Sequence, residues 1–154
     1  MENKILKNRN AVRAVIINKD KILLLRKEDH RGIRYALPGG AQDIGESLEQ
    51  ALQRECFEEI NTDVDVINLI SIVEAHKASS RVEGKRWHQI DFLFNCSVPE
   101  DYIPKNGLRP DNGQVAVEWL PVNQLTILTL SLKILPDILN KADFSVSNVY
   151  HGMR

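Results

Sequence analysis

A run of acidic residues after Gly40 constrains this chain more than any other feature. Its pattern is Gly40, five residues, Glu46, seven residues, and then Arg54-Glu55-Cys56-Phe57-Glu58-Glu59. On a helix, Glu55, Glu58 and Glu59 would lie on neighbouring turns of one face, because side chains three and four residues apart are neighbours there. Like charges at this spacing repel, so the arrangement does not favour an isolated helix. Carboxylate oxygens held on a rigid element are, however, the ligands that Mg²⁺ requires.

The same segment carries signals for where a helix begins and ends. Ser47, followed three residues later by Gln50, matches a capping box, in which each side chain bonds the backbone of the other residue. Asn61 falls where the helix should stop, since asparagine tolerates the left-handed conformation of a helix terminus. We therefore predict a loop over 38–46, a helix over 47–60 and a new strand soon afterwards.

The predicted helix also has an apolar stripe. A helical wheel groups Leu52, Cys56 and Ile60 on one face and places Glu59 at the edge of that face. A charged group at the edge of a buried stripe costs stability unless it is paired or binds a metal. The acidic cluster is therefore a candidate metal site; the alternative is an acidic surface helix.

This segment resembles the signature box of the Nudix hydrolases, Gly-x5-Glu-x7-Arg-Glu-U-x-Glu-Glu-x-Gly-U, in which U is a bulky apolar residue. The fixed positions of the box are matched by Gly40, Glu46, Arg54, Glu55, Glu58 and Glu59. Three positions depart from it, namely Cys56, Asn61 and Thr62. Cysteine keeps the packing role of a small apolar residue, and asparagine can adopt the turn that glycine would. The flanking Tyr35-Ala36-Leu37-Pro38-Gly39-Gly40 is also similar to the family's approach to its box.

Periodicity elsewhere predicts an α/β domain. Strand patterns cover 11–17, 21–26, 64–74, 89–97 and 115–120. A short helical turn is expected over 122–125, and a helical pattern covers 128–140, with Pro136 bending or breaking it. A mixed sheet flanked by helices fits this order. The resemblance implies more: a Nudix-type α/β/α sandwich with a catalytic loop and helix, in a single domain over 1–154 with its core at about 10–140.

Composition narrows the classes of partner. A chain of 154 residues with a net charge of −1 is one ordinary domain and does not suggest binding to nucleic acid through its phosphates. No apolar run is long enough to span a membrane, and the N-terminus lacks a signal-peptide core. Two cysteines without metal-ligand spacing indicate no disulfide framework. We expect a cytoplasmic protein.

The resemblance implies the chemistry. The family hydrolyses a nucleoside diphosphate linked to another moiety, by attack of water on phosphorus, and divalent metals bridge the phosphate oxygens in such reactions. We expect Mg²⁺ as the cofactor, with Mn²⁺ as the alternative. Glu55 and Glu59 are assigned as metal ligands, and Glu58 as a third ligand or, through a water, the general base. A backbone carbonyl of Gly39 or Gly40 completes the metal shell.

The other box residues have a supporting role in this interpretation. Arg54 and Glu46 are expected to join the helix and its preceding loop by a salt bridge, which would orient the catalytic glutamates. Some family members take their base from a later loop. The candidates here are Asp101, Asp111 and Glu118, and for each the alternative is a solvated acid.

Substrate contacts are less constrained. Arg13 and Arg26 lie on the first predicted strands and would suit a phosphate, the alternative being surface charge. The basic segment 81–88 contains Trp87 and could be a mobile loop that stacks a base, or an ordinary hairpin loop with Trp87 packed at a strand start. Tyr35 is a candidate for the nucleoside pocket. His76 and His88 lack metal-ligand spacing and are interpreted as incidental.

Three functions remain open from the sequence. The first is a hydrolase acting on ADP-ribose or another nucleotide sugar, or on a nucleoside triphosphate. The second is a catalytically silent Nudix-fold module that binds a ligand or regulates. The third is an acidic helix that buffers metal, which does not explain Gly39-Gly40 or Arg54. The resemblance also allows a homodimer.

Overall fold

The fold is seen in a computed structural model that describes residues 4–79, 82–145 and 150–154. Its strands are β1 (Lys4–Asn18), β2 (Lys21–Asp29), β3 (Gly32–Ala36), β4 (Gly39–Ala41), β5 (Asp65–Ala78), β6 (Lys85–Ser97) and β7 (Gln114–Pro121). Its helices are α1 (Leu48–Ile60), the 3₁₀ helix η1 (Val122–Ile127) and α2 (Leu135–Lys141). No helix in the described ranges is long and apolar enough to cross a membrane.

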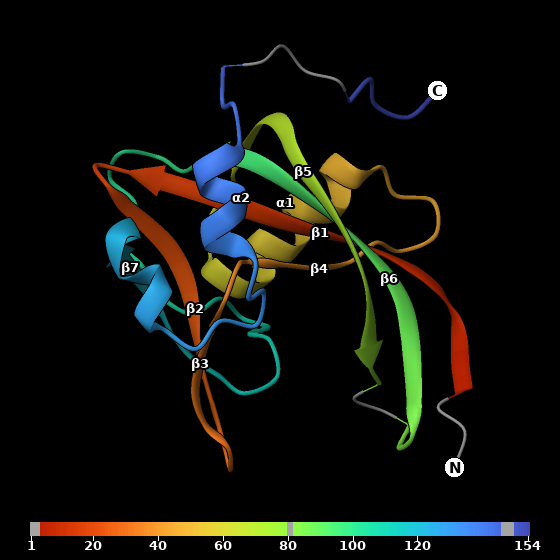
Figure 1. Ribbon diagram of the computed structural model, residues 1–154. Coiled ribbons are helices and arrows are strands. Elements are labelled where there is room, and N and C mark those ends of the chain that lie inside the picture. The colour runs from red at the N-terminus through yellow and green to blue at the C-terminus, as the bar shows by residue number, and fades with distance from the viewer. Residues whose placement is uncertain (1–3, 80–81, 146–149) are drawn as a thin grey trace.

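Strand β1 is the centre of the sheet, which has the order β3-β2-β1-β6-β5. Its middle pairs antiparallel with β4 on one side and parallel with β6 on the other, and its end pairs with β2. Strand β7 joins the far side of β2. In Figure 1 the β5–β6 pair and the β2–β3 pair diverge from β1 toward the lower part of the view. The sheet therefore has two branches that share one strand.

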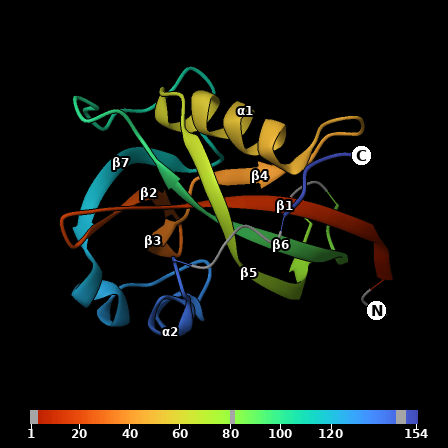
Figure 2. The same cartoon turned by 90° about the horizontal axis from the view of Figure 1, so that it is seen from above.

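The two helices cover opposite faces of this sheet, as Figure 2 shows from above. Successive residues of a strand point to opposite faces, so each strand contributes to two cores. On the α1 side, Ala14 and Phe94 pack against Leu52 of the helix. On the α2 side, Val15 and Leu93 belong to the cluster that contains residues of the helix. The mixed sheet and the α/β class predicted from the sequence are thus confirmed.

Several boundaries differ from the prediction. Strand β1 begins seven residues before the predicted residue 11, since it starts at Lys4. Strand β3 was not predicted; it pairs with β2 as a hairpin. Part of the predicted 38–46 loop is strand β4, which pairs with Ala11, Val12 and Arg13 of β1. A three-residue strand rich in glycine lacks the period-2 pattern by which strands are recognised.

The predicted helix over 128–140 is wrong for its first half. Residues 128–134 do not belong to a helix, and α2 covers only Leu135–Lys141. Pro136 lies in the first turn of α2 instead of bending a longer helix. Proline suits that place because the first amides of a helix have no partner within it. The apolar period in 128–134 instead reflects side chains that pack beneath the sheet, such as Leu130 and Leu132.

Candidate active site

Helix α1 is held at both ends as the sequence predicts. The Ser47 hydroxyl accepts from the Gln50 amide, and the Gln50 side chain accepts from the Ser47 amide, which completes the capping box. Asn61 ends the helix in the left-handed conformation, with φ 59° and ψ 40°. Leu52, Cys56 and Ile60 are buried, and Glu59 beside them is only 2% exposed. The helix therefore carries an ionisable group into its own buried face.

A backbone amide of β4 donates a hydrogen bond to the buried Glu59 carboxyl group. The Gly39 N–H donates to Glu59 Oε1 over 2.7 Å. Gly39 has φ +141°, and a Cβ built on it would lie 1.9 Å from the Val12 carbonyl oxygen. A Cβ on Gly40 would lie 2.5 Å from the carboxyl carbon of Glu55. Gly39 thus lets β4 approach the backbone of β1 more closely than any side chain would allow, and a side chain at position 40 would displace the Glu55 carboxyl.

Arg54, on α1, connects the helix with the 41–46 segment that precedes it. Its guanidinium donates to both oxygens of Glu46, over 2.8 and 2.9 Å, which confirms the predicted salt bridge. It also donates to Glu55 Oε1 over 2.9 Å and to the Ala41 carbonyl over 3.0 Å. Glu58 Oε2 lies 3.7 Å away. The hydrogen bonds from Arg54 lower the pKa of Glu46 below its usual value. One cation therefore orients three of the four glutamates of the box.

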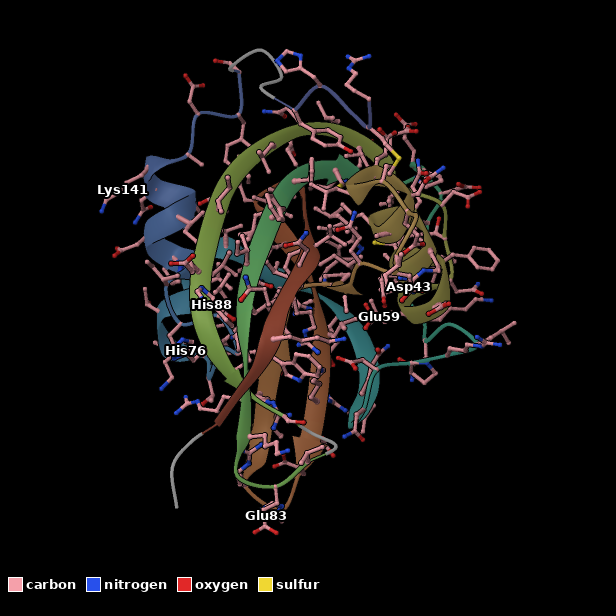
Figure 3. The ribbon with its side chains drawn as sticks, turned by 90° about the vertical axis from the view of Figure 1, so that its right-hand side faces the viewer. Asp43, Glu59, His76, Glu83, His88 and Lys141 are labelled. Carbon is pink, nitrogen blue, oxygen red and sulfur yellow. The ribbon has the colours of Figure 1, made fainter. Side chains whose placement is uncertain are left out.

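Burial raises the pKa of Glu59, the fourth glutamate of the box. Loss of solvation raises the pKa of Glu59 to about 8, although the Gly39 amide opposes this, and Asp111 and Glu55 add to it. Burial also raises the pKa of Glu55, against the hydrogen bond from Arg54. Such groups favour either a proton or a cation beside them. Figure 3 shows Glu59 on the α1 side of the molecule, away from the labelled His76 and His88.

These donors fit a hard divalent cation by their chemistry, since all are carboxylate or carbonyl oxygens. Within the ranges that the structure describes, however, no three acidic, histidine or cysteine side chains converge into a complete metal site. The assignment of Glu55, Glu58, Glu59 and the Gly40 carbonyl as ligands therefore stays a prediction.

A cleft opens between the two branches of the sheet next to this turn. Arg13, Lys77 and Asp91 line it from the β1–β6–β5 branch, and Lys27 and Ala36 line it from the other. Leu37, Asp111, Ser131 and Leu132 complete the lining. Its volume of about 100 Å³ leaves room for several water molecules. Three lining side chains carry positive charge and two carry negative charge, and Arg13 and Lys27 are paired with the two aspartates, so one positive charge is left in excess.

Arg13 connects the cleft with the glutamates. Its Nε donates to Asp91 over 3.0 Å, and its Nη1 donates to the Gly39 carbonyl over 3.1 Å. Sequence reasoning singled out Arg13 but missed Asp91, Lys27 and Lys77. The alternation of polar and apolar residues in 89–97 marks Asp91 as a strand residue and says nothing of its partner. Only the parallel pairing of β1 with β6 brings the two together.

The loop over 98–113 packs against the C-terminal end of α1. Amides of Gly107 and Arg109 donate to the carbonyls of Glu59 and Glu58, each over 3.0 Å. The Gln114 side chain donates to the Glu59 carbonyl as well, over 2.8 Å. These donors satisfy carbonyls that have no partner within a helix. The loop also carries Asp111, which forms an ion pair with Lys27 in the cleft.

The other candidate acids lie elsewhere. Asp101 is exposed in the 98–113 loop, and neither an ion pair nor a hydrogen bond of its side chain is found in the part of the chain described. Glu118, on β7, binds Arg26 over 2.9 Å, and Arg26 also lies 3.5 Å from Glu28. Neither Glu118 nor Arg26 lines the cleft. Of the three later acids, only Asp111 is brought near Glu59.

The two aromatic candidates are also separated from the cleft. Tyr35, on β3, packs against the core on the α2 side. Trp87 belongs to β6, with the Lys7 ammonium 5.6 Å and the Arg9 guanidinium 5.3 Å from its ring centre. It lines a second depression, which also borders the 41–46 segment before α1. The hairpin alternative is therefore confirmed for the described residues, because 82–84 lie between the paired strands β5 and β6 and Trp87 lies near the start of β6; Arg81 lies outside the described residues.

The comparisons with known proteins agree with this architecture. Relatives include the putative nudix hydrolase 1 of Caenorhabditis elegans, which is 28% identical over 152 residues, or 94% of this chain and 38% of the relative. The 8-oxo-dGDP phosphatase NUDT18 of Mus musculus is 29% identical over 113 residues, or 71% of this chain and 31% of the relative. The putative ADP-ribose pyrophosphatase YjhB of Bacillus subtilis is 29% identical over 89 residues, or 58% and 41%. This chain thus spans less than half the length of these relatives.

A solved structure supports the fold. The NUDIX hydrolase from Nitrosomonas europaea superimposes with a TM-score of 0.66 at 23% identity and covers 86% of each chain. The family model of the NUDIX domain matches residues 7–139, which is most of the 154-residue sequence. The spacing of the box, the packing of its helix on β4 and this match all lead to the same conclusion: the chain belongs to the NUDIX domain family.

Proposed function

We propose that this chain hydrolyses a nucleoside diphosphate linked to another moiety, with a divalent cation as cofactor. The observation that carries the proposal is the buried Glu59 carboxyl, held by the Gly39 amide at the turn where β4 meets α1. A stable fold has no need of a carboxyl whose burial raises its pKa to about 8. A cation bound beside it would offset that cost.

Each box residue has a distinct task in this proposal. Glu55, Glu58 and Glu59, with the Gly40 carbonyl, would hold Mg²⁺, or Mn²⁺ as the alternative. When bound, the cation neutralises phosphate charge and lowers the pKa of its water. Glu58 is alternatively the base, acting through a water, since its side chain is more exposed than those of Glu46, Glu55 and Glu59. Arg54 and Glu46 orient the others through their paired hydrogen bonds.

The cleft supports a phosphate-bearing substrate. Arg13, Lys27 and Lys77 line the cleft, Arg13 connects it through Gly39 with Glu59, and arginine can bind phosphate oxygens in a bidentate manner. Two substrate classes are rivals: ADP-ribose or another nucleotide sugar, and an oxidised or ordinary nucleoside triphosphate. The name of the Bacillus relative refers to ADP-ribose, and the name of the mouse relative refers to an oxidised nucleoside diphosphate. We propose a small nucleotide of one of these classes as the substrate.

The test is phosphate release by the purified chain with Mg²⁺. The panel consists of ADP-ribose, nucleotide sugars, oxidised and ordinary nucleoside di- and triphosphates, and dinucleoside polyphosphates, with a phosphatase added to reveal phosphomonoester products. Glu58→Gln and Glu59→Gln are each expected to lower kcat by orders of magnitude. Glu49→Gln, an exposed position in the first turn of the same helix, is the matched control and should retain activity.

Two results would count against the proposal. If Glu59→Gln kept full activity, the assignment of Glu59 as a metal ligand would be wrong. If the wild-type protein bound Mg²⁺ but hydrolysed nothing in the panel, the silent binding module would become the better interpretation.

A further inference from the structure

Strand β6 carries two buried polar side chains that the proposed reaction does not use. Gln89 is 0% exposed and Asp91 is 2% exposed. Burying a charge costs several kcal/mol unless it is paired and hydrogen-bonded, and apolar residues of similar size are often at least as stable. A buried carboxylate on a central strand is therefore weak evidence for a role in stability alone.

The hydrogen bonds of this pair form a continuous chain. Asp91 Oδ1 accepts from Arg13 Nε and from Gln89 Nε2, each over 3.0 Å, and its Oδ2 also accepts from Gln89 Nε2 over 3.0 Å. Gln89 Oε1 in turn accepts from Arg9 Nε over 2.8 Å. Gln89 is thus fixed by Arg9, and its amide nitrogen donates to both oxygens of the Asp91 carboxylate. The carboxylate of Asp91 consequently has little freedom to turn.

At its other end, this chain of hydrogen bonds reaches the turn at Gly39, next to Glu59. Arg13 donates its Nη1 to the Gly39 carbonyl, and the N–H of the same Gly39 donates to Glu59. Arg13 spans from Asp91 to this turn and lines the cleft, with 23% of its side chain exposed. Its Nε and Nη1 are therefore engaged by the protein, and the part of the guanidinium that faces the cleft is held in one orientation.

We propose that Asp91 is a positioning residue that, supported by Gln89, holds Arg13 at once against the Gly39 turn and toward a phosphate group of the substrate. The inference rests on the proposed function for its substrate. It adds a residue outside the box and explains why a negative charge is buried 78 residues from its partner in the sequence. Arg13 is the residue that would touch the phosphate; Asp91 acts only through it.

The experiment compares Asp91→Asn with wild type on the substrate that the hydrolysis panel identifies. Asparagine keeps the shape of the side chain but removes its charge, so the bond to Arg13 weakens. Losing one charge-assisted hydrogen bond corresponds to roughly a 10- to 100-fold change. We expect a rise in KM of that order and a smaller fall in kcat, with Mg²⁺ affinity unchanged within about threefold. Gln89→Ala, which leaves the Asp91–Arg13 pair in place, should raise KM less.

A matched control separates positioning from stability. Asn95 lies on the same strand four residues beyond Asp91 and bonds Asn68 over 3.3 Å, away from the cleft. Asn95→Ala is expected to lower the melting temperature without altering KM. If Asp91→Asn lowered the melting temperature and left KM unchanged, Asp91 would be structural and the inference would be overturned. If Asp91→Asn did not fold, an unchanged KM in Gln89→Ala would overturn it equally.

A second readout does not depend on turnover. Binding of inorganic pyrophosphate with Mg²⁺, measured by calorimetry, should weaken by a similar factor in Asp91→Asn and remain unchanged in Asn95→Ala. Equal binding by wild type and Asp91→Asn, or no binding by wild type, would overturn the role given to Arg13. Because this readout requires no hydrolysis, failure of the proposed function and failure of the positioning role can be distinguished.

Discussion

The buried carboxyl of Glu59 makes a quantitative prediction about stability. Its pKa is about 8 in the folded protein against an ordinary value of 4.5, because burial penalises the charged form. Between these values the native state keeps a proton that the unfolded chain has lost. The buried Glu59 therefore costs the metal-free protein no free energy of unfolding below about pH 4.5. Above that, the free energy of unfolding falls as the pH rises toward 8. From these two values, keeping Glu59 protonated while the unfolded chain ionises costs the metal-free fold about 3 kcal/mol at pH 7 and less than about 1 kcal/mol at pH 5.

Glu59→Gln isolates this effect. The glutamine carbonyl can still accept from the Gly39 amide, and any cost of its buried NH₂ group does not depend on pH. The variant should thus gain about 2 kcal/mol relative to wild type between pH 5 and pH 7. Urea unfolding at 25 °C with EDTA, at several pH values, measures this difference. Glu83→Gln, an exposed glutamate in the β5–β6 turn (Figure 3), should follow wild type throughout.

A cation should reverse the same cost. At pH 8, saturating Mg²⁺ is expected to raise the melting temperature of wild type by several degrees, at about 2–4 °C per kcal/mol for a chain of this size. Glu59→Gln should respond much less. A stability difference between wild type and Glu59→Gln that is the same at pH 5 and pH 7 would refute the reasoning, since it would mean that Glu59 ionises in the fold without penalty.

Three further substitutions test the packing around the site. Arg54→Lys should lower the free energy of unfolding by about 1–3 kcal/mol in urea, because an ammonium cannot replace the paired bonds to Glu46; an unchanged midpoint would contradict this. Gly40→Ala should weaken Mg²⁺ binding at least about tenfold by calorimetry, since its Cβ would lie 2.5 Å from the Glu55 carboxyl carbon; unchanged affinity would mean that Glu55 is no ligand. Gly107→Ala should cost about 1–3 kcal/mol in thermal unfolding, because its Cβ would lie 2.1 Å from the Glu58 carbonyl oxygen, and no loss would show that the 98–113 loop moves freely.

Local signals in the sequence were sufficient for the helix of the site. The capping box, the apolar stripe and the left-handed Asn61 are properties of residues a few positions apart, and each is found as predicted. The Arg54–Glu46 pair was also predicted, because the spacing of the box links it to a known arrangement. Where the signals were weak or misleading, as in the glycine-rich β4 and the apolar 128–134 segment, the prediction failed.

The sequence by itself therefore determined the family and the acidic helix, and it predicted the residues that we propose carry the chemistry. Only the tertiary structure decided which groups distant in the sequence contact one another around the site. Asp91 meets Arg13, Lys27 meets Asp111, and Glu59 meets Gly39 because β1 pairs with both β4 and β6 while β2 diverges from them. Contacts between distant strands depend on register and sheet twist, which no short pattern encodes. For the same reason Arg26, equally basic and on a neighbouring strand, lies outside the cleft that Arg13 lines.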